Sequence, residues 1–435
     1  MKTVRITHPT KKIKAQIELP ASKSISNRAL IIQALSSEKI TLNNLSTADD
    51  TKLMQYALNA DSSTIDIKNA GTCMRFLTAY FASTNCEVEL RCDERMEDRP
   101  IKILVDALRE LGAEISYLKK DGFPPLKIKG KQLEGGKIKL NASISSQYIS
   151  ALMLAAPIFK NGLEIELTGE VSSKSYIEMT VDLMNYFGFN CSFIENKIII
   201  KNQPIIKSSN YKIEQDWSAA SYWYEIVSLS DEAEILLKGL SLKTLQGDSI
   251  ISEYMKKFGV DTLEKDEGIL LKKFNHREIE TQNENVFVSS SLSLRTESRN
   301  ENKSSTNLSN TLDLTPTLAV TAAAKNVLTQ LSGLKNLKIK ESDRLQSLKV
   351  ELTKCGFDIE ANDDSLHIKH HTINIQSSTI NRFQTYNDHR MAMAFAPLAL
   401  IFDEVLIENP DVVEKSYPHF WSDLALAGFE LVFNS

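Results

Sequence analysis

Residues 19–30 read LPASKSISNRAL, and the pattern of this stretch decides how the chain is built. A Pro–Ala turn leads into Ser22, Lys23 and Ser24, and an apolar helical run follows as far as Leu35. At such a start, unpaired backbone N–H groups and the positive end of the helix dipole point the same way. That arrangement suits an anion, phosphate above all. Taken alone, these residues favour a simpler interpretation, a serine-capped helix with solvated cations.

The same pattern, a polar turn followed by a helix of small and apolar residues, returns along the chain. The six turns begin at Ser22, Asn69, Ser143, Glu214, Asp313 and Tyr386. Short β-rich runs lie between them, among them Lys137–Leu140, Leu337–Ile339 and Val405–Ile407. Four amphipathic helices each end at a capping glycine: Ile101–Leu111, Tyr176–Phe187, Ile250–Phe258 and Arg344–Cys355. We therefore predict an α/β fold of about six repeated units, whose helices are buried together and covered by sheet.

Length and composition predict a globular protein of two domains. The chain has 435 residues, of which 42% are hydrophobic and 25% charged, which is ordinary for a soluble protein able to form two cores. The net charge is −5, so the protein lacks the positive electrostatic field that favours nucleic-acid binding. Any anion site must therefore be a local concentration of Lys and Arg.

Cysteine usage and hydropathy predict a cytoplasmic protein that does not enter a membrane. The five cysteines are odd in number and form no C-x-x-C pair, which argues against a disulfide framework and a zinc site. The N-terminal residues contain no apolar signal-peptide region. The longest apolar run, Met391–Phe402, is too short to span a bilayer and contains Pro397.

One segment departs from the repeated pattern. Ser289–Thr311 is rich in Ser, Asn and charged residues and has no apolar period. We interpret it as an exposed, mobile insertion. A functional lid is the alternative, but the segment lacks the glycine hinges and aromatic residues that lids often carry.

Two of the motifs concentrate small or cationic residues near helix starts. In NAGTCMR, Gly71 lets a ligand approach the backbone closely, and Arg75 lies one turn into the helix. Gly71 also fits an ordinary tight turn. RMEDRP places Arg95 and Arg99 just ahead of another helix. For Arg95 we favour a charged, solvated loop.

Three further motifs carry hydroxyl, charged or titratable groups. Ser145–Gln147 offers neutral donors at a helix start, although a double serine cap fits these residues as well. KIKESDRL packs Lys340, Glu341 and Arg344 closely together, and a solvated charge run is the usual meaning of such a string. YNDHRMAM places three charged or titratable groups, His389 among them, where a long apolar helix begins.

Taken in this order, the motifs resemble a known family. The chain closely resembles the 5-enolpyruvylshikimate-3-phosphate synthases, the 3-phosphoshikimate 1-carboxyvinyltransferases of aromatic amino acid synthesis. The resemblance covers nearly the whole chain and is carried by SKSISNRAL, NAGTCMR, ERMEDRPI, SISSQ, SSKSYI, KESDRL and YNDHRMAM. The sister family, the UDP-N-acetylglucosamine enolpyruvyl transferases, lacks the first of these strings and the ESDRL–DHRMAM pair.

The resemblance implies a two-domain inside-out α/β barrel, with three βαββαβ units in each domain, helices inside and sheets outside. By analogy, residues 21–213 form the shikimate-phosphate-binding domain. Residues 1–20 and 214–435 form the second domain, which carries the polar insertion near 289–311. The chain is expected to cross between the domains near Pro20–Ala21 and Ile213–Glu214, and both domains present helix N-termini to the cleft.

The resemblance also implies two binding sites, carried over position by position. The shikimate-3-phosphate site would use Lys23, Ser24, Arg28, Ser145, Ser146, Gln147, Ser173, Tyr176, Asp313, Asn336 and Lys340. The phosphoenolpyruvate site would use Lys23, Gly71, Arg99, Gln147, Arg344, Arg390 and Lys415. These two small molecules are the expected binding partners. The protein itself is expected to be a monomer.

The implied chemistry is addition followed by elimination, without metal, nucleotide or other cofactor. The 5-hydroxyl of shikimate-3-phosphate attacks C2 of the enolpyruvyl group while C3 takes a proton, and phosphate then leaves. Asp313 is the candidate base for the hydroxyl. Glu341 is the candidate acid–base group at C3, assisted by Lys23. How these three and His389 divide the proton transfers is left open.

The chain departs from the family pattern at several positions. Phe76 replaces the usual proline after NAGTxMR, Ala21 replaces a glycine at the hinge, and Leu312 replaces the proline before Asp313. The segment Asn59–Asp66 is also short. None of these changes removes a charged group from the expected sites.

Two other readings stay open at this stage. The sister family commonly uses a reactive cysteine on a mobile loop, and here Cys92 lies at the edge of the corresponding loop. A non-catalytic scaffold on the same fold is the second reading. The presence of Lys23, Asp313, Glu341 and His389 argues against it.

Overall fold

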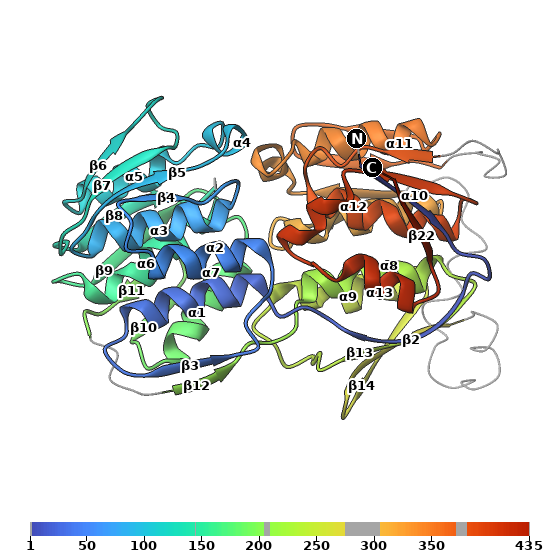
Figure 1. The fold of residues 1–435 in the computed structure, drawn as a ribbon, viewed down its shortest axis with the longest axis horizontal. Helices are drawn as coiled ribbons and strands as arrows, with labels where there is room; N and C mark the ends of the chain where they lie inside the picture. Colours follow the sequence, from blue (N-terminus) through green and yellow to red (C-terminus); the bar gives the residue numbers. More distant parts are fainter. Residues whose placement is uncertain (1, 144, 204–208, 275–304, 371–380, 435) are drawn as a thin grey trace.

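The computed structural model describes residues 2–143, 145–203, 209–274, 305–370 and 381–434. Within them the chain forms two halves that lie side by side (Figure 1). One hydrophobic core is built from residues between Ala21 and Ile213. The other combines Val4–Leu19 with residues from Trp217 to Phe429. The chain therefore has two cores, and its N-terminal residues belong to the second.

Six of the polar turns predicted from sequence do begin helices, and these helices lie at the centre of each half. In the first half they are α1 (Lys23–Leu35), α3 (Gly71–Ser83) and α6 (Ser146–Ala155), which contact one another. In the second half they are α8 (Trp217–Leu229), α10 (Thr315–Ala324) and α12 (His389–Phe395). Every residue of α10 and α12 is buried, because helices with small and apolar residues on all sides have no face for water.

Sheets cover these helices, and five of the sheets share one topology. In each, the first strand pairs parallel with the second, and two antiparallel neighbours complete four strands. In the first half they are β4 (Thr64–Asp66), β5 (Glu87–Arg91), β7 (Leu126–Lys129) and β6 (Glu114–Tyr117), and β8 (Gly136–Asn141), β9 (Leu163–Thr168), β11 (Lys197–Ile200) and β10 (Cys191–Ile194). In the second half they include β2 (Lys12–Glu18), β13 (Glu232–Lys238), β15 (Gly268–Lys273) and β14 (Val260–Lys265), and β16 (Ser305–Asn307), β17 (Thr329–Ser332), β19 (Ser365–Ile368) and β18 (Ile359–Ala361). The predicted inside-out α/β fold is thus confirmed.

The fifth four-stranded sheet contains the N-terminal strand. Its order is β20 (Asn381–Phe383), β21 (Val405–Glu408), β1 (Thr3–Thr7) and β22 (Glu430–Asn434). The first strand of the chain therefore lies between two of the last, and both termini are drawn in the same half in Figure 1. The two crossings between the halves hold each other: Ser22 N donates to Glu214 O at 2.8 Å and Asp216 N to Pro20 O at 2.9 Å.

The sixth sheet is smaller than the repeat predicts. It has two strands, β3 (Ile40–Asn43) and β12 (Ser209–Lys212), which pair parallel. Between β3 and β4 the chain forms only helix α2 (Asp49–Asn59). The short segment before Asp66 leaves no residues for an additional hairpin, so this unit is incomplete.

The outer helices end where the glycines predict. The helices α5 (Lys102–Glu110), α7 (Lys174–Tyr186) and α11 (Arg344–Lys354) are followed by Gly112, Gly188 and Gly356, whose φ angles are 100°, 92° and 85°. Only a residue without Cβ adopts such angles cheaply. The helix predicted over 250–258 is irregular: α9 (Ile251–Tyr254) lies between 3₁₀ turns at Gly247–Ile250 and Met255–Phe258. Two further short helices are α4 (Glu94–Glu97) and α13 (Phe420–Leu426).

Two sequence predictions in the second half are wrong. Leu337–Ile339 is not a strand but part of a 3₁₀ turn, Lys335–Ile339. In the sheet of β16, β17, β19 and β18, the edge strand is β16, which comes from the end of the predicted insertion. Residues 289–304 of that insertion lie outside the described part of the chain, but residues 305–311 are not simply exposed, because Leu308 is completely buried in the core.

Candidate active site

A cavity of about 90 Å³ lies between the two halves, and both contribute to its wall. The sequence-predicted site residues converge on it, except Gly71 and Lys415, which lie just behind the wall. Those that line it are Lys23, Ser24, Arg28, Arg99, Ser145, Ser146, Gln147, Ser173, Tyr176, Asp313, Asn336, Lys340, Glu341, Arg344, His389 and Arg390. Cations from opposite halves thus surround one space in a protein whose net charge is −5.

The start of α1 supplies the first part of the wall. Ser22 caps the helix, and its hydroxyl accepts from Ile25 N at 3.5 Å. Lys23 is the first helical residue, and its Nζ lies 3.3 Å from Asp50 Oδ2. Arg28, one turn further on, donates from Nε to Thr180 Oγ1 at 2.8 Å and from one terminal nitrogen to Ser150 Oγ at 3.1 Å. Burial lowers the pKa of Arg28 to about 10, so it stays a cation at neutral pH.

Two further helix starts in the first half bring hydroxyl groups to the cavity. Ser145 caps α6, accepting from Gln147 N at 3.3 Å, and the Gln147 side chain donates to Thr72 Oγ1 at 3.4 Å. Ser173 precedes α7 in the left-handed conformation, with φ of 57°. Tyr176, in the first turn of α7, donates from its hydroxyl to Asp313 Oδ2 of the other half at 3.1 Å. Neutral donors therefore line the cavity beside its cations.

The second half contributes a compact ion network. Arg344 begins α11, is 1% exposed, and contacts three carboxylates: Asp313 at 2.9 Å, Glu341 at 2.9 Å and Asp388 at 2.7 Å. Arg390 in α12 contacts the second oxygen of Asp313 at 2.7 Å. Asp388 is also the cap of α12, accepting from Arg390 N at 3.0 Å. Cations that could bind a ligand are therefore neutralised by acidic side chains here.

The pKa of Asp313 reflects two opposed effects. Burial favours the neutral acid, but Arg390, Lys340 and Arg344 outweigh burial and hold the pKa of Asp313 well below its ordinary value. Asp313 is thus ionised at neutral pH.

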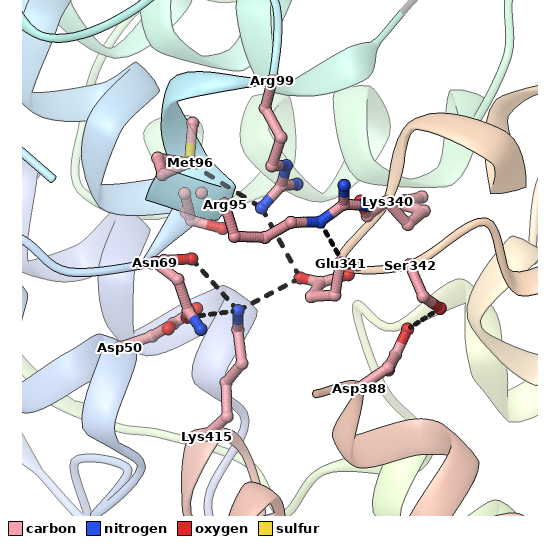
Figure 2. A network of polar contacts seen from close by, with 12 residues as sticks. Asp50, Asn69, Arg95, Met96, Arg99, Lys340, Glu341, Ser342, Asp388 and Lys415 are labelled. Atoms are coloured by element: carbon pink, nitrogen blue, oxygen red, sulfur yellow. Dashed lines mark hydrogen bonds and ion pairs between the residues drawn. The ribbon is translucent and has the colours of Figure 1, made fainter. Parts of the chain in front are cut away.

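Glu341 lies at the centre of the polar network in Figure 2. Its carboxylate is 3.5 Å from Lys415 Nζ, 3.8 Å from Arg99 and 2.9 Å from Arg344. Burial again favours the neutral acid, but Lys415, Arg99 and Arg344 hold the pKa of Glu341 well below its ordinary value. Lys415 also donates to the side-chain oxygen of Asn69 at 2.7 Å. Lys415 therefore reaches the cavity through Glu341 rather than by lining it.

Gly71 is explained by a close approach. A Cβ built at this position would lie 2.6 Å from a terminal nitrogen of Arg99, inside contact distance. The absence of a side chain at the start of α3 lets the Arg99 guanidinium lie flat against the backbone. Gly71 thereby shapes the cavity although it does not line it.

His389 is buried beside the cavity and has no hydrogen-bond partner for either ring nitrogen among the described residues. Burial, with the charges of Lys23 and Arg390, lowers the pKa of His389 well below its ordinary value. The ring is therefore neutral at pH 7 and has both a donor and an acceptor available.

Sequence reasoning missed some of the wall and misjudged one arginine. Asp50 and Arg75 line the cavity. The only sequence signal for Asp50 was its place in the first turn of a helix, which does not distinguish it from any capping acid. Arg95 was interpreted as part of a charged loop; it is indeed exposed, but it lies in the short helix α4, and its Nε donates to the main-chain oxygen of Glu341 at 2.7 Å. That contact joins residues 246 positions apart, so no local pattern signals it.

The arrangement suits anionic ligands that undergo proton transfer. Cations and helix starts can bind phosphate or carboxylate groups. Two ionised carboxylates and a neutral histidine lie within the same space and can accept or donate protons. Among the described residues, no group of three or more His, Cys, Asp or Glu side chains is placed to hold a metal ion. In the same part of the chain, no helix has the length and apolar character needed to cross a membrane.

Comparison with known proteins identifies similar chains. The family model of EPSP synthase (3-phosphoshikimate 1-carboxyvinyltransferase) matches residues 7–61 and 56–424. A 3-phosphoshikimate 1-carboxyvinyltransferase of Bacteroides fragilis (strain YCH46) is 45% identical over 417 residues, which cover 96% of each chain. The enzyme of that name from Haemophilus influenzae (strain PittEE) is 33% identical over 454 residues, 95% of this chain and 96% of the relative. The solved EPSP synthase of Acinetobacter baumannii shares the fold, with a TM-score of 0.75, 20% identity and full coverage of both chains.

Proposed function

Since the chain belongs to the EPSP synthase (3-phosphoshikimate 1-carboxyvinyltransferase) family, we propose that the cavity between its halves is where its reaction takes place. The enzyme transfers the enolpyruvyl group of phosphoenolpyruvate to the 5-hydroxyl of shikimate-3-phosphate and releases phosphate, a step of aromatic amino acid synthesis. Both substrates carry a phosphate and a carboxylate. The observation that carries the proposal is the convergence of cations from both halves on one cavity in an acidic protein.

We assign shikimate-3-phosphate to the wall made by α1, α6 and α7. The proposed ligands are Lys23, Ser24, Arg28, Ser145, Ser146, Gln147, Ser173, Tyr176, Asp313, Asn336 and Lys340. Three helix starts with hydroxyl donors support this assignment, because such starts bind phosphate without needing many full charges. Asn336 adds a link across the cleft, since its amide donates to Ser143 O at 3.1 Å and Ser172 Oγ at 2.8 Å.

We assign phosphoenolpyruvate to the more cationic end of the cavity. The proposed ligands are Lys23, Gly71, Arg99, Gln147, Arg344, Arg390 and Lys415. In the structure these cations face Asp50, Asp313, Glu341 and Asp388. A phosphate or carboxylate can take up donors that these acids leave unused, and Arg offers a planar fork that matches either group.

Substrate binding supplies the pKa change that the carboxylates need. Asp313 and Glu341 are weak bases as long as the surrounding cations stabilise their charge. Anionic substrates engage the same cations and add negative charge nearby, and both effects raise a carboxyl pKa toward neutrality. The acid–base groups thereby become effective when both substrates are present.

The proposed steps follow from this arrangement. Asp313 accepts the proton of the 5-hydroxyl while the hydroxyl oxygen bonds to C2. At the same time protonated Glu341, assisted by Lys23, donates a proton to C3. In the second step the C2–O bond to phosphate breaks, Glu341 takes the proton back from the C3 methyl group to restore the double bond, and the departing phosphate takes the proton held by Asp313. Arg and Lys stabilise the charge on the departing phosphate. Neutral His389 lies close enough to the cavity to relay a proton.

We also propose domain boundaries and an assembly state. The two separate cores support one domain of residues 21–213 and another of 1–20 with 214–435, which carries the insertion near 289–311.

A monomer is supported by the fact that one chain supplies every proposed ligand. A cytoplasmic location is supported by five cysteines that are all free thiols. Light scattering after size exclusion tests the monomer, and a peak at twice the mass of the chain would contradict it.

The sister activity is not favoured by the geometry of Cys92. Burial, together with Glu97 and Asp93, raises the pKa of the Cys92 thiol to about 12. A nucleophilic cysteine needs the opposite shift.

The decisive experiment measures phosphate release from phosphoenolpyruvate with and without shikimate-3-phosphate. Release should require shikimate-3-phosphate and should not be supported by UDP-N-acetylglucosamine. Glu341→Gln and Lys23→Met should each lower kcat by about 100-fold or more, and the Glu341→Gln variant should still bind shikimate-3-phosphate. Glu94→Gln, which changes an exposed glutamate of α4, is the matched control. Near-normal turnover of Glu341→Gln would remove Glu341 from the mechanism.

A further inference from the structure

Arg95 and Arg99 reach the same residue of the opposite half from one short segment. Figure 2 shows both side chains extending from the region of α4 toward Glu341. Arg99 is buried and lies 3.8 Å from the carboxylate of Glu341. Arg95 is exposed, and its Nε donates to the main-chain oxygen of Glu341 at 2.7 Å. A terminal nitrogen of Arg95 also lies 3.5 Å from Lys340 O. One arginine therefore faces the side chain and the other holds the backbone.

The support for Arg95 is firm, although its side chain is exposed. Asp93 caps α4 by accepting from Met96 N at 3.0 Å, and Arg99 N donates to Met96 O at 3.0 Å, so both ends of this turn are fixed. Met96 is fully buried and anchors the turn in the first core. A charged donor on a rigid base loses less entropy on binding than one on a mobile loop.

The segment that Arg95 contacts carries two proposed site residues. Lys340 follows the 3₁₀ turn Lys335–Ile339, and α11 starts at Arg344 with Asp343 as its cap. Within this connection, Ser342 Oγ donates to Asp388 Oδ2 at 3.2 Å. Arg95 fixes the two carbonyl groups that precede Ser342. The orientation of these peptides sets where the side chains of Lys340 and Glu341 enter the cavity.

Arg95 stands outside the cavity. It lines two outer grooves, one shared with Glu341 and Asn387 and the other with Asn69 and Lys415. Glu341 separates Arg95 from the cavity, whose wall includes Glu341 but not Arg95. Arg95 therefore has no route to the substrates except through the residue it holds.

We infer that Arg95 is a positioning residue, which places the Glu341 carboxylate for proton transfer by binding the Glu341 main-chain oxygen across the cleft. The inference rests on the proposed role of Glu341. It assigns a task in catalysis to a side chain that the sequence pattern marks as a solvated charge. A proton is transferred efficiently only over a narrow range of geometry, so a small displacement of Glu341 lowers the rate while leaving ligand binding largely intact.

The test compares Arg95→Ala, Arg95→Lys and a matched control, Arg91→Ala. Arg91 is an exposed arginine of β5 whose guanidinium pairs with Glu89 on the same strand. Arg95→Ala should lower kcat about 10- to 100-fold, because a charge-assisted hydrogen bond to the backbone is lost. The KM for shikimate-3-phosphate should change by less than about threefold, since Lys340 is the only one of its proposed ligands that Arg95 contacts among the described residues. Arg95→Lys should restore part of kcat, since one donor remains but not the planar fork.

The outcomes separate this inference from the proposed function. If Glu341→Gln is inactive but Arg95→Ala turns over within twofold of the unsubstituted enzyme, the positioning role fails and the role of Glu341 stands. If Glu341→Gln retains near-normal turnover, the proposed role of Glu341 fails first. If Arg95→Ala raises the KM for shikimate-3-phosphate as much as it lowers kcat, Arg95 serves cleft closure in general and the inference is wrong. If the Tm of Arg95→Lys equals that of Arg91→Ala, the Arg95→Lys variant is folded normally. The kcat of Arg95→Lys then decides whether Arg95 has the positioning role.

Discussion

At the scale of single residues, the cavity depends on a missing methyl group. Gly71 leaves space for the Arg99 guanidinium, which would lie 2.6 Å from a Cβ at this position. The guanidinium must move if that methyl group is added, because the three atoms nearest to it all belong to Arg99. The proposed phosphoenolpyruvate site would then lose the hydrogen-bond donors of the Arg99 guanidinium.

Gly71→Ala should therefore raise the KM for phosphoenolpyruvate roughly tenfold, equivalent to about 1.4 kcal/mol. The backbone of Gly71 is helical, so alanine adds no strain of its own. Steady-state kinetics with each substrate varied in turn measure the effect. The KM for shikimate-3-phosphate and the Tm serve as internal controls and should stay unchanged. A phosphoenolpyruvate KM within twofold of the original would show that Arg99 can move without loss.

A second residue matters for stability rather than for the reaction. Glu225 lies in the middle of α8, is completely buried, and has no hydrogen-bond partner among the described residues for either oxygen. Burial raises the pKa of Glu225 well above its ordinary value. The folded protein thus binds a proton that the unfolded chain releases above about pH 4.5. The stability contributed by the neutral acid is complete below that pH and falls as pH rises toward the folded-state pKa.

Glu225→Gln should remove this pH dependence. The amide is polar and of similar size, so the substitution removes ionisation and little else. The gain in free energy of unfolding, of order 1–3 kcal/mol, should be larger at pH 8 than at pH 5. Urea unfolding at the two pH values measures it. Equal effects of the substitution at both pH values would show that Glu225 is paired in a way that keeps its pKa ordinary.

At the scale of elements, the start of α7 joins the halves. Ser173 N donates to Ser309 O at 2.8 Å, Lys174 N to the side chain of Asn310 at 3.1 Å, and Ser175 Oγ to Asn310 O at 2.7 Å. The other half thus supplies acceptors for the free N–H groups of this helix. On the far side, Gly247 packs against Ser175 so closely that a Cβ would lie 2.4 Å from the Ser175 Cβ.

Gly247→Ala should therefore keep the halves from closing fully. We expect the KM for shikimate-3-phosphate to rise about tenfold, because Ser173 and Tyr176 lie in the displaced turn. The radius of gyration from small-angle X-ray scattering with both substrates bound should be larger than that of the original enzyme. Gly188→Ala, after the other end of α7, is the control for strain alone: its φ of 92° disfavours alanine, so it should lower the Tm but leave this KM unchanged. An unchanged KM would mean that the packing at Ser175 relaxes locally.

The elements that could be predicted from sequence are those with local causes. Four of the six inner helices (α1, α6, α8 and α12) have capping side chains at their starts, and the outer ones have glycines at their ends, so these were found. Leu337–Ile339 failed because three alternating residues fit a strand and a 3₁₀ turn equally well. What decides between them is whether a neighbouring strand is available. The edge position was taken by β16, whose polar sequence gives no sign of it.

At the scale of the whole molecule, the site exists only where the halves meet. The motifs identified the residues on each wall, but not which pairs would contact each other. Contacts such as Arg95 with Glu341 and Tyr176 with Asp313 join residues far apart in the chain. No pattern within one stretch contains that information: Lys23 and Glu341 were named as site residues through the family resemblance, which gave no partner for Arg95.

The separate cores predict that residues 21–213 fold when expressed alone. Their buried apolar residues form one cluster, to which the described part of the second half adds only the partly buried Leu245. This fragment should show cooperative thermal unfolding, although without phosphate release. Far-UV circular dichroism and differential scanning calorimetry measure the cooperativity of unfolding of this fragment. The complementary fragment 214–435 is the control and should fold poorly, because it lacks β1 and β2. A fragment 21–213 that melts without cooperativity would refute the proposed boundary.

The place of β1 has a consequence for biosynthesis. Its pairing partners, β21 and β22, are made only after residues 21–213 and most of the second half. The nascent chain therefore carries β1 as an unpaired, aggregation-prone strand until those partners emerge, while the contiguous half made in between can fold at once. The second half is completed only when these strands meet. We expect chaperones that capture exposed strands to bind the nascent chain at β1.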